Sequence, residues 1–529
     1  MSAAIGRDTL AVRLTELLGA ESVITEAEEL AFYSADVYTR GVTAALAIRP
    51  QDRASLPAAI KAATERGYAI VTRGGGMSYT GGYLPRQPRT LLVDLSALNK
   101  IIEINAQDMV ITVEAGVTWK QIWDALRPQG LRLPFFGTFS GSRATVGGGL
   151  SNGALFMGTA RHGTAAEIVL GMEIISADGT LIRTGQSAFH NGRPGFRNYG
   201  PDLTGLFVHD AGTLGVKTLA SLRLMKQPQA QDYASFAFHK AETATATLSD
   251  LARSGLAEEA YIFDPATTRR SLDPATLKRD LERLGAVIRE QGALGRGLRE
   301  GARMIKAGRG FAASDMHTLH FVCAGRSRDA ARADLEAGRE LALAAGGMEI
   351  ANTIPKAARA NPFEPLNGIL GSQGERWAAL NAKVPHSDAG RLIKATEQLL
   401  APYSETMTQH GVTLSFLFIA INNHIFSYEP VLRWFDEWLP VHKRTPEPEH
   451  LARLKEPSPD PAARALVDEI RSRIVSLFAE FGAASNQIGK TYPHLSSLNP
   501  ASRGLLRAIK SELDPNGLMN PGALGDFSS

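Results

Sequence analysis

Two dense clusters of glycine place the strongest constraint on how this 529-residue chain can fold. Five of the ten residues from Arg73 to Gly82 are glycine, and eight more lie between Pro134 and Gly163. Glycine-rich turns leave backbone N–H groups bare, and such groups form concave anion sites that a diphosphate can approach closely. The two clusters therefore predict two loops, on one α+β layer, that hold a large phosphorylated cofactor.

The residues around the first cluster predict a β-α-β unit, with an extended segment at 45–49, a helix at 56–66 and a strand at 69–72. Further strands are expected at 90–94 and 109–114, and a helix at 118–129. The turn Ala177-Asp178-Gly179 joins strands at 169–176 and 180–183. A long loop is expected at 184–205 before another glycine-bearing segment.

The residue pattern changes near residue 227, because no glycine clusters follow it. Strand-helix-strand patterns recur at 233–263 and 317–350, with an Arg-rich helical stretch at 274–306 between them. From residue 482 the chain regains Gly, Asn and Pro. We therefore expect residues 227–481 to form a second domain, inserted into a first domain made of 1–226 and 482–529.

Composition excludes several classes of protein. The 57 Lys and Arg residues balance 54 Asp and Glu residues, which is too even to indicate a nucleic-acid surface. The single cysteine, Cys323, excludes an intrachain disulfide and a Cys-based zinc cage. No apolar run approaches the ~20 residues of a membrane helix, and the first 20 residues do not resemble a signal peptide. We expect a cytoplasmic protein with no transmembrane segment.

Two common phosphate-binding signatures are absent. The pattern G-x-G-x-x-G fails because Gly147 and Gly149 are followed by Asn152 where the last glycine is required. Gly489-Lys490-Thr491 is similar to the end of a P-loop, but Ala484 stands where that motif needs glycine.

Four ordered motifs over about 450 residues are instead similar to a known family: Val-Thr-Arg-Gly-Gly-Gly-Met-Ser-Tyr-Thr-Gly-Gly at 71–82, Ser-Arg-Ala-Thr-Val-Gly-Gly-Gly at 142–149, Asp-Leu-Thr-Gly-Leu-Phe at 202–207 with Gly-Thr-Leu-Gly-Val at 212–216, and Asp-Pro-Asn-Gly-Leu-Met-Asn-Pro-Gly at 514–522. The chain resembles the FAD-binding oxidoreductases of the vanillyl-alcohol oxidase type, which include glycolate and D-lactate dehydrogenase subunits. The resemblance implies an α+β fold, with a two-subdomain FAD-binding domain of the p-cresol methylhydroxylase type and an inserted α+β cap.

The same resemblance implies which residues contact FAD. In that family the first glycine loop holds the pyrophosphate, and the later motifs lie along the extended cofactor. Some relatives attach the flavin to a histidine of the first loop, but Met77 occupies that position here and cannot form the bond. The implied contacts are Arg73, Gly74, Gly75, Gly76, Met77, Ser78, Ser142, Thr145, Gly147, Gly148, Asn152, His162, Gly163, Val216 and Asn520.

The catalytic candidates lie on the cap and at its return to the first domain. A flavin supplies the electron-accepting chemistry, so the protein must position a C–H bond and manage a proton. His424 follows an apolar strand, while Tyr492 and His494 lie where the chain re-enters the flavin domain. Each histidine either accepts the proton of an alcohol or has a structural role. Tyr79, beside the first loop, either faces the substrate or packs.

No metal site is predicted. His317 and His320 lie three residues apart on an expected strand at 316–322, so their side chains point to opposite faces of the sheet. Many hydroxyacid dehydrogenases of the family carry a His-x-Gly-Asp-Gly-Asn-x-His motif, whereas this chain has Ile-Ala-Ile-Asn-Asn-His at 419–424. This departure argues against a metal-assisted hydroxyacid mechanism.

The substrate is left among a few classes. Alkylphenol oxidases of the family hold a phenolate with Tyr-Arg, and this chain has Tyr492-Pro493 instead, although segments 171–175 and 179–185 are close to those enzymes. We expect an FAD-dependent dehydrogenase or oxidase that takes hydride from a hydroxyl-bearing carbon of a small hydroxyacid or aromatic alcohol. It would pass electrons to an acceptor not yet identified, and a homodimer is one arrangement the sequence allows. The alternatives are 4-alkylphenol oxidation through a phenolate and flavin-dependent alkyl transfer without net redox change.

Overall fold

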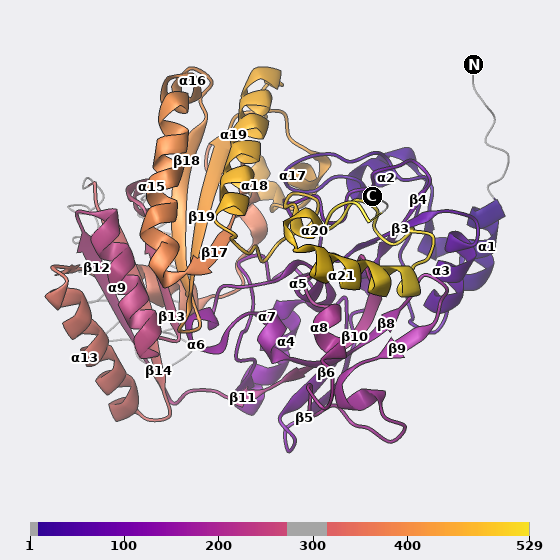
Figure 1. The fold of residues 1–529 in the computed structure, drawn as a ribbon, viewed down its shortest axis with the longest axis horizontal. Helices are drawn as coiled ribbons and strands as arrows, with labels where there is room; N and C mark the ends of the chain where they lie inside the picture. Colours follow the sequence, from indigo (N-terminus) through magenta and orange to yellow (C-terminus); the bar gives the residue numbers. More distant parts are fainter. Residues whose placement is uncertain (1–8, 272–314, 528–529) are drawn as a thin grey trace.

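The computed structural model describes residues 9–271 and 315–527. Figure 1 shows two bodies side by side, one from the first 226 residues with the yellow C-terminal segment lying on it, and one from the middle of the chain. The combination of helices and sheets predicted from the sequence is confirmed. The helical stretch expected at 274–306 lies outside the described residues.

The first glycine loop follows directly from a small four-stranded sheet. Its strands have the order β1-β2-β4-β3, and β2, β4 and β3 run parallel. Because β3 ends at Arg73, the loop leaves the carboxyl end of a parallel strand, where ligands of open α/β sheets commonly bind. The elements of this subdomain are α1 (Thr9–Leu18), β1 (Val23–Ile24), α2 (Ala27–Tyr33), β2 (Leu46–Ile48), α3 (Leu56–Thr64), β3 (Ala69–Arg73) and β4 (Thr90–Asp94).

The second subdomain contains an antiparallel five-stranded sheet of order β5-β6-β10-β8-β9. Its elements are β5 (Ile101–Asn105), β6 (Val110–Glu114), α4 (Trp119–Leu126), α5 (Val146–Asn152), α6 (Thr159–His162), α7 (Ala165–Ile168), β8 (Val169–Ile175), β9 (Leu181–Arg183), α8 (Leu203–Leu206) and β10 (Val216–Arg223). The loop expected at 184–205 ends slightly earlier than predicted, because Asp202 accepts a hydrogen bond from Gly205 N and α8 begins at Leu203.

The middle of the chain forms an antiparallel sheet of order β15-β12-β14-β13-β18-β19-β16, with β17 also paired to β19. Its strands are β12 (Ala230–Phe238), β13 (Glu259–Phe263), β14 (His317–Gly325), β15 (Met348–Glu349), β16 (Arg376–Ala379), β17 (Ala382–Pro385), β18 (Thr413–Ile421) and β19 (Ile425–Trp434). Its helices are α9 (Ala241–Ser254), α10 (Pro265–Ser271), α13 (Arg328–Ala344), α14 (Thr353–Ala360), α15 (Ala389–Leu400), α16 (Ser404–Gln409), α17 (Pro440–Arg444), α18 (Pro448–Leu451) and α19 (Pro461–Glu480).

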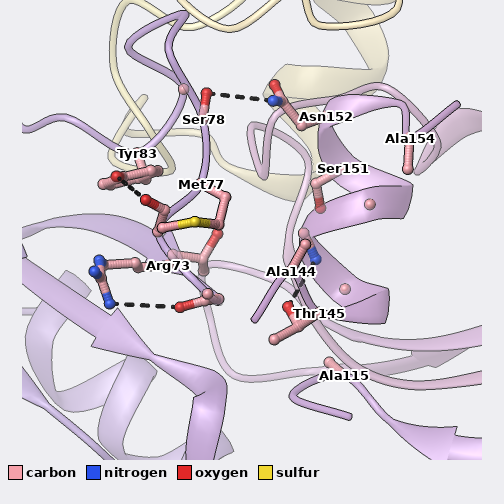
Figure 2. A pocket seen from close by; sticks show the side chains of 18 of the residues that line it. Arg73, Met77, Ser78, Tyr83, Ala115, Ala144, Thr145, Ser151, Asn152 and Ala154 are labelled. Atoms are coloured by element: carbon pink, nitrogen blue, oxygen red, sulfur yellow. Dashed lines mark hydrogen bonds between the residues drawn. The ribbon is translucent and has the colours of Figure 1, made fainter. Parts of the chain in front are cut away.

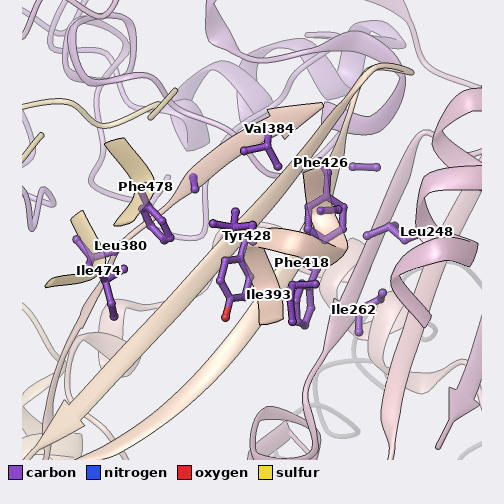
Figure 3. Close-up of a cluster of buried hydrophobic side chains, with 14 of the residues drawn as sticks. Leu248, Ile262, Leu380, Val384, Ile393, Phe418, Phe426, Tyr428, Ile474 and Phe478 are labelled. Atoms are coloured by element: carbon purple, nitrogen blue, oxygen red, sulfur yellow. The ribbon is translucent and has the colours of Figure 1, made fainter. Parts of the chain in front are cut away.

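The two faces of this cap sheet differ in character. Since side chains alternate along a strand, one face carries Phe418, Phe426 and Tyr428, which pack against residues of α15 and α19 such as Ile393 and Phe478 (Figure 3). The opposite face, here called the inner face, turns toward the first domain. There the ring of Trp377 contacts Tyr79, and the ring of Tyr261 contacts Phe156. The apolar outer face thus stabilises the cap, while the inner face can carry other groups.

The C-terminal segment returns to the first domain through α20 (His494–Ser497) and α21 (Pro500–Leu513). Met519 pairs with Ile70 of β3, and Ala484 pairs with Lys383 of the cap. A short link, β7 (Leu131–Arg132) with β11 (Met225–Lys226), precedes the cap. We propose the domain limits 1–226, 227–481 and 482–529, because the cap strands and their covering helices fall between residues 230 and 480.

Across residues 9–271 and 315–527, no helix combines the length and the apolar character needed to span a membrane.

The outer face of the cap sheet predicts a clear difference between a buried and an exposed phenylalanine. Phe426 is fully buried, whereas Phe435 is 41% exposed. We expect Phe426→Ala to lower the free energy of unfolding by about 3–5 kcal/mol, because it leaves a cavity in a packed core. Phe435→Ala should change it by less than about 0.5 kcal/mol. Denaturant unfolding followed by tryptophan fluorescence would check both values, and equal losses would contradict this account of the core.

Candidate cofactor and substrate site

A pocket lies between the two glycine clusters (Figure 2). Its empty space is about 920 Å³, part of it open to solvent. One wall is the loop after β3 and the other is α5 with the segment before it. The lining comprises residues 72–78, 144–145, 147–149 and 151–154 together with Gly82, Tyr83, Leu95, Ala115, Trp119, Thr138, Ser140, Ala211, Lys217 and Gln487.

The glycines are required because main-chain segments approach one another closely at this pocket. A Cβ atom on Gly75 would lie 2.0 Å from the carbonyl oxygen of Arg143, and one on Gly147 would lie 2.8 Å from Cβ of Ala115. Gly76 has φ +72°, a backbone conformation that favours glycine. The clusters therefore bring two subdomains together and keep side chains out of the space between them.

Arg73 places a buried positive charge at one end of the pocket. Its guanidinium lies 4.9 to 5.5 Å from the ring centres of Phe32, Tyr33 and Tyr83. Among the described residues, its Nε and Nη2 atoms are buried without a hydrogen-bond partner. An uncompensated buried cation of this kind fits an anionic ligand.

The structure brings ten of the predicted cofactor contacts into the pocket lining: Arg73, Gly74, Gly75, Gly76, Met77, Ser78, Thr145, Gly147, Gly148 and Asn152. The other five lie outside that lining. The Ser142 hydroxyl donates to the carbonyl oxygen of Glu364, and His162 Nε2 lies 3.3 Å from a Glu258 carboxylate oxygen, so both side chains contact the cap. The role predicted for all fifteen as FAD contacts stays a prediction.

The remaining three support the pocket from behind or beside it. Asn520 donates through Nδ2 to the carbonyl oxygens of Gly82 and Ala211, both of which line the pocket. Val216 is buried in the core of the first subdomain, and Gly163 follows α6 with φ +78°.

Two tyrosines connect this pocket to the inner face of the cap. Gln487 lines the pocket and donates through Nε2 to the Tyr79 hydroxyl at 2.9 Å. The Tyr492 hydroxyl accepts from Asn381 N, at the start of the cap strand β17, at 2.7 Å. Burial raises the pKa of Tyr492 to about 12 and that of Tyr79 well above 10. Both hydroxyls therefore keep their protons at neutral pH and can donate them in hydrogen bonds.

The two predicted histidines lie in different surroundings. His424 is exposed in the turn between β18 and β19, with Nδ1 3.3 Å from Asn423 Oδ1. His494 begins α20 and is half-buried, and burial lowers its pKa. The structure thus groups Tyr79 and Tyr492 with the pocket and leaves His424 on a surface turn. The catalytic roles of these four residues stay predictions.

The other histidine pair behaves as the strand spacing predicts. His320 lies on the inner face, between Ser235 at 2.8 Å and Thr318 at 2.9 Å, and His317 lies on the opposite face. Within residues 9–271 and 315–527, no group of three or more His, Cys, Asp or Glu is arranged to hold a metal ion.

Sequence reasoning missed four charged or polar residues near the site. Lys217 lines the pocket and donates to Asp210 at 2.5 Å, and Gln487 lines it from the return segment. Lys383 and Glu429 lie on the inner face of the cap sheet. The only available signal was a charged residue at alternate positions of otherwise apolar strands, a pattern that ordinarily indicates a solvent-facing side.

Two segments that contribute to this site match known protein families. Residues 44–185 match the FAD binding domain family, and residues 494–524 match the C-terminal domain of FAD linked oxidases. These ranges contain the first glycine loop, the second glycine cluster and the return segment. Both matches are to domains of FAD-binding proteins, one on each side of the cap.

The relatives in sequence match only in part. A cytochrome-type mitochondrial D-lactate dehydrogenase of Saccharomyces cerevisiae is 34% identical over 199 residues, which is 37% of this chain and 32% of the yeast protein. A glycolate oxidase subunit of Bacillus subtilis is 28% identical over 204 residues, 39% of this chain and 42% of that protein. The chain therefore spans less than half the length of these relatives.

The relatives in structure match over nearly the whole chain. p-Cresol methylhydroxylase with bound substrate aligns with a TM-score of 0.73 at 18% identity, covering 99% of both chains. A 4-ethylphenol oxidase from Gulosibacter chungangensis gives 0.70 at 18% identity, covering 99% of this chain and 98% of that one. An alkyldihydroxyacetonephosphate synthase gives 0.69 at 12% identity, covering 98% and 86%. These likenesses show the fold.

The pocket fits FAD, the cofactor named by the matched domain family. Four atoms on lining residues are buried without a partner among the described residues: Arg73 Nε and Nη2, Trp119 Nε1 and Asn152 Oδ1. They comprise donors and an acceptor, as a molecule with phosphates and hydroxyls requires. The glycine positions leave the space that added Cβ atoms would fill.

Two glycines of the pocket separate cofactor binding from folding. A Cβ on Gly148 would meet only Thr145 Oγ1, at 3.3 Å, whereas one on Gly75 would meet the Arg143 carbonyl at 2.0 Å. We expect Gly148→Ala to weaken FAD binding at least tenfold with unchanged stability of the cofactor-free protein, because the methyl group enters the cofactor space. Gly75→Ala should lower both the affinity for FAD and the stability of the cofactor-free protein.

Fluorescence titration with FAD and thermal unfolding of stripped protein would measure these two effects. Gly504→Ala serves as control, since a Cβ there meets nothing within 4 Å. Full FAD affinity in both pocket variants would show that the cofactor does not lie between the clusters.

Proposed function

We propose that the protein is an FAD-dependent oxidoreductase that takes hydride from a hydroxyl-bearing carbon of a small organic substrate. The observation that carries the proposal is the link through Gln487, which lines the glycine pocket and donates to Tyr79 on the side facing the cap. The cofactor pocket and a set of polar groups able to handle a substrate hydroxyl therefore meet at one place.

Bound FAD supplies the hydride-accepting chemistry. The chain's own residues position the substrate and manage its proton. Tyr79 and Tyr492 are held protonated by burial, so each can donate a hydrogen bond to an oxygen that gains negative charge as the hydroxyl proton leaves. The cap sheet covers this region and restricts the access of water.

A second candidate is oxidation of a 4-alkylphenol. The rings of Tyr79 and Trp377 lie 5.4 Å apart, which gives the substrate side an aromatic wall. Tyr492 lies near Tyr79. The residue that follows it is Pro493 rather than an arginine that would pair with a phenolate. Alkyl transfer without net redox change is supported only by a shared fold with the synthase.

The proposal extends to the location of the protein and its partners. A cytoplasmic location is supported by a single cysteine, Cys323, which is buried and unpaired. The yeast relatives carry "mitochondrial" in their names. We keep a homodimer and a separate electron acceptor as predictions, to be examined on the purified protein.

Anaerobic mixing of the FAD-loaded protein with hydroxyacids, benzylic alcohols and 4-alkylphenols tests the proposal. We expect at least one hydroxyl-bearing compound to bleach the flavin absorbance at 450 nm within seconds at millimolar concentration, on the order of ordinary enzyme turnover. Bleaching by alkylphenols alone would favour the second candidate. A flavin that binds fully and is reduced by none of the three classes would refute the redox proposal.

A further inference from the structure

The inner face of the cap holds a concentration of buried polar atoms without partners. Asn381 Nδ2 and Ser427 Oγ belong to the cap, and Asn486 Oδ1 and His209 Nε2 belong to the first domain and its return segment. Nearly all buried polar groups in native proteins are hydrogen-bonded, so a cluster of unpaired ones points to a ligand. No partner for these atoms occurs within residues 9–271 and 315–527.

Contacts join Asn486 and Asn381 into one strip that begins at the cofactor pocket. Asn486 Nδ2 donates to the carbonyl oxygen of Gly153, a pocket residue, at 2.9 Å. Asn486 N in turn donates to Asn381 Oδ1 at 3.2 Å, and the Ser485 hydroxyl donates to the same oxygen at 2.8 Å. Because Asn381 Oδ1 accepts two hydrogen bonds, the orientation of its amide is fixed and its NH₂ group is the unpaired end.

Lys383 and Glu429 lie on this same face. In the antiparallel pairing of β17 with β19, Lys383 is opposite Ser427, and Glu429 is two residues beyond Ser427 on the same side of the strand. The register runs on from β16 to β17, which places Asn381 level with Glu429. Neither the Lys383 ammonium nor the Glu429 carboxylate forms an ion pair or side-chain hydrogen bond in the described parts of the chain, and both residues are half-buried.

The polarity of the strip indicates the charge of its ligand. Lys383 Nζ, Asn381 Nδ2 and Ser427 Oγ are three donors available on adjacent positions, which is the set that a carboxylate accepts from. Glu429 is the only carboxylate level with them among the described strands β16, β17 and β19 on this face. The two charged positions are separated by roughly 7 Å along the strand, since each residue advances it by about 3.3 Å. That spacing suits a small molecule whose anionic group and hydroxyl are a few bonds apart.

Burial brings both charged groups into the range of neutral pH. Loss of hydration lowers the pKa of Lys383 to about 7, although Glu167 and Glu429 face it and act in the opposite direction. Loss of hydration raises the pKa of Glu429 to about 7, against the opposing effect of Lys383. His209 also faces Lys383, and burial keeps its pKa near 3, so it is neutral. Proton acceptors are most effective when their pKa is close to the working pH.

We propose that Lys383, with Asn381 and Ser427, binds the carboxylate of a small hydroxy acid, and that Glu429 accepts the proton of its hydroxyl. This inference rests on the proposed function, which supplies the oxidant. The C–H bond of the carbinol carbon breaks and its electron pair leaves with hydrogen as hydride to oxidised FAD. The O–H bond breaks, its proton passes to the Glu429 carboxylate and the carbon–oxygen double bond forms. The products are a keto acid, reduced FAD and protonated Glu429.

Binding can be tested separately from oxidation with acids that have no hydrogen on the carbinol carbon. The probes are 2-hydroxyisobutyrate and atrolactate, with 2-hydroxyisobutyramide as the uncharged match. We expect both acids to perturb the flavin spectrum of the FAD-loaded protein and the amide to bind at least tenfold more weakly. Lys383→Met should weaken acid binding by about 10²-fold, as for a truncated buried charge partner. Lys120→Met, an exposed lysine on α4, is the control and should change nothing.

Ser427→Ala provides a variant that keeps its fold, because it removes a buried hydroxyl that has no partner. It should weaken acid binding severalfold without lowering the midpoint of thermal unfolding. Affinity for the acids should also fall about tenfold per pH unit above pH 7, since Lys383 then loses its proton before binding. Equal binding of acid and amide, or unchanged binding in Lys383→Met, would overturn the assignment of the carboxylate site.

Glu429→Gln tests the proton acceptor. We expect hydroxy acids still to bind, flavin reduction to slow by about 10²-fold or more, and the rise of the reduction rate near pH 7 to disappear. Glu405→Gln, on an exposed turn of α16, is the matched control. A rise near pH 7 that persists in Glu429→Gln and disappears in His424→Gln would overturn the assignment. If the acids bind as expected but no compound reduces the flavin, the redox proposal fails and the binding site stands.

Discussion

The cofactor site depends on main-chain atoms of two subdomains lying closer together than any side chain would allow. Gly75 packs against the carbonyl oxygen of Arg143, and Gly147 packs against Ala115. These contacts join the loop after β3 to the segment that leads into α5, so that one wall of the pocket comes from each sheet. Since the approach is between backbones, neither loop can adjust by rotating a side chain, and the two sheets fix the width of the pocket.

The cap depends on a different constraint, the alternation of side chains along its strands. Its outer face buries aromatic residues such as Phe236, Phe321 and Tyr428 against covering helices. Most of the apolar burial that stabilises the cap therefore lies on one side of the sheet. The inner face can then carry unpaired polar groups whose burial would otherwise be too costly for the fold. Because the outer face supplies the stability, the inner face of a rigid sheet can place polar side chains beside a pocket in another domain.

Much of the fold could be predicted from the sequence because its signals are local. A glycine needed for close approach is visible as a glycine, and the β-α-β unit around Ala69–Arg73 is visible in the spacing of apolar residues. The side-chain contacts of matched motif residues were not visible in this way. Ser142 and His162 lie in motif segments, yet their side chains contact the cap at Glu364 and Glu258. A motif fixes the course of the backbone, whereas the rotamer depends on whichever distant segment packs beside it.

Lys383 and Glu429 could not be recognised from the sequence for a related reason. A charged residue alternating with apolar ones is what a solvent-facing strand also shows. The return segment shows what lies beside them: Ala484 pairs with Lys383 at the edge of β17, and Asn486 N donates to Asn381 Oδ1. The pairing of Lys383 with Ala484 joins residues about 100 positions apart, and no nearby sequence pattern predicts it.

The interface between the domains treats buried charge in two opposite ways. At one place Arg132 and Arg359 pair with Glu258 and Glu259, with Arg359 Nε 2.7 Å from Glu259. Although burial alone would raise it, the two arginines hold the pKa of Glu258 well below its usual range, so this carboxylate stays charged near neutral pH. At Lys383 and Glu429 no such pairing occurs, and burial dominates the pKa of both.

A paired cluster joins the cap to the first domain, and its two arginines pair with its two glutamates. A charge that loses hydration without gaining a partner destabilises the protein that carries it, so its persistence requires something that offsets the cost. Two such charges share the inner face with unpaired donors, and that strip of groups leads to a cofactor pocket. A bound anion that donates a hydroxyl proton would satisfy both charges at once. The absence of pairing, rather than the amount of charge, therefore distinguishes the reacting end of this interface from the end that holds the two domains together.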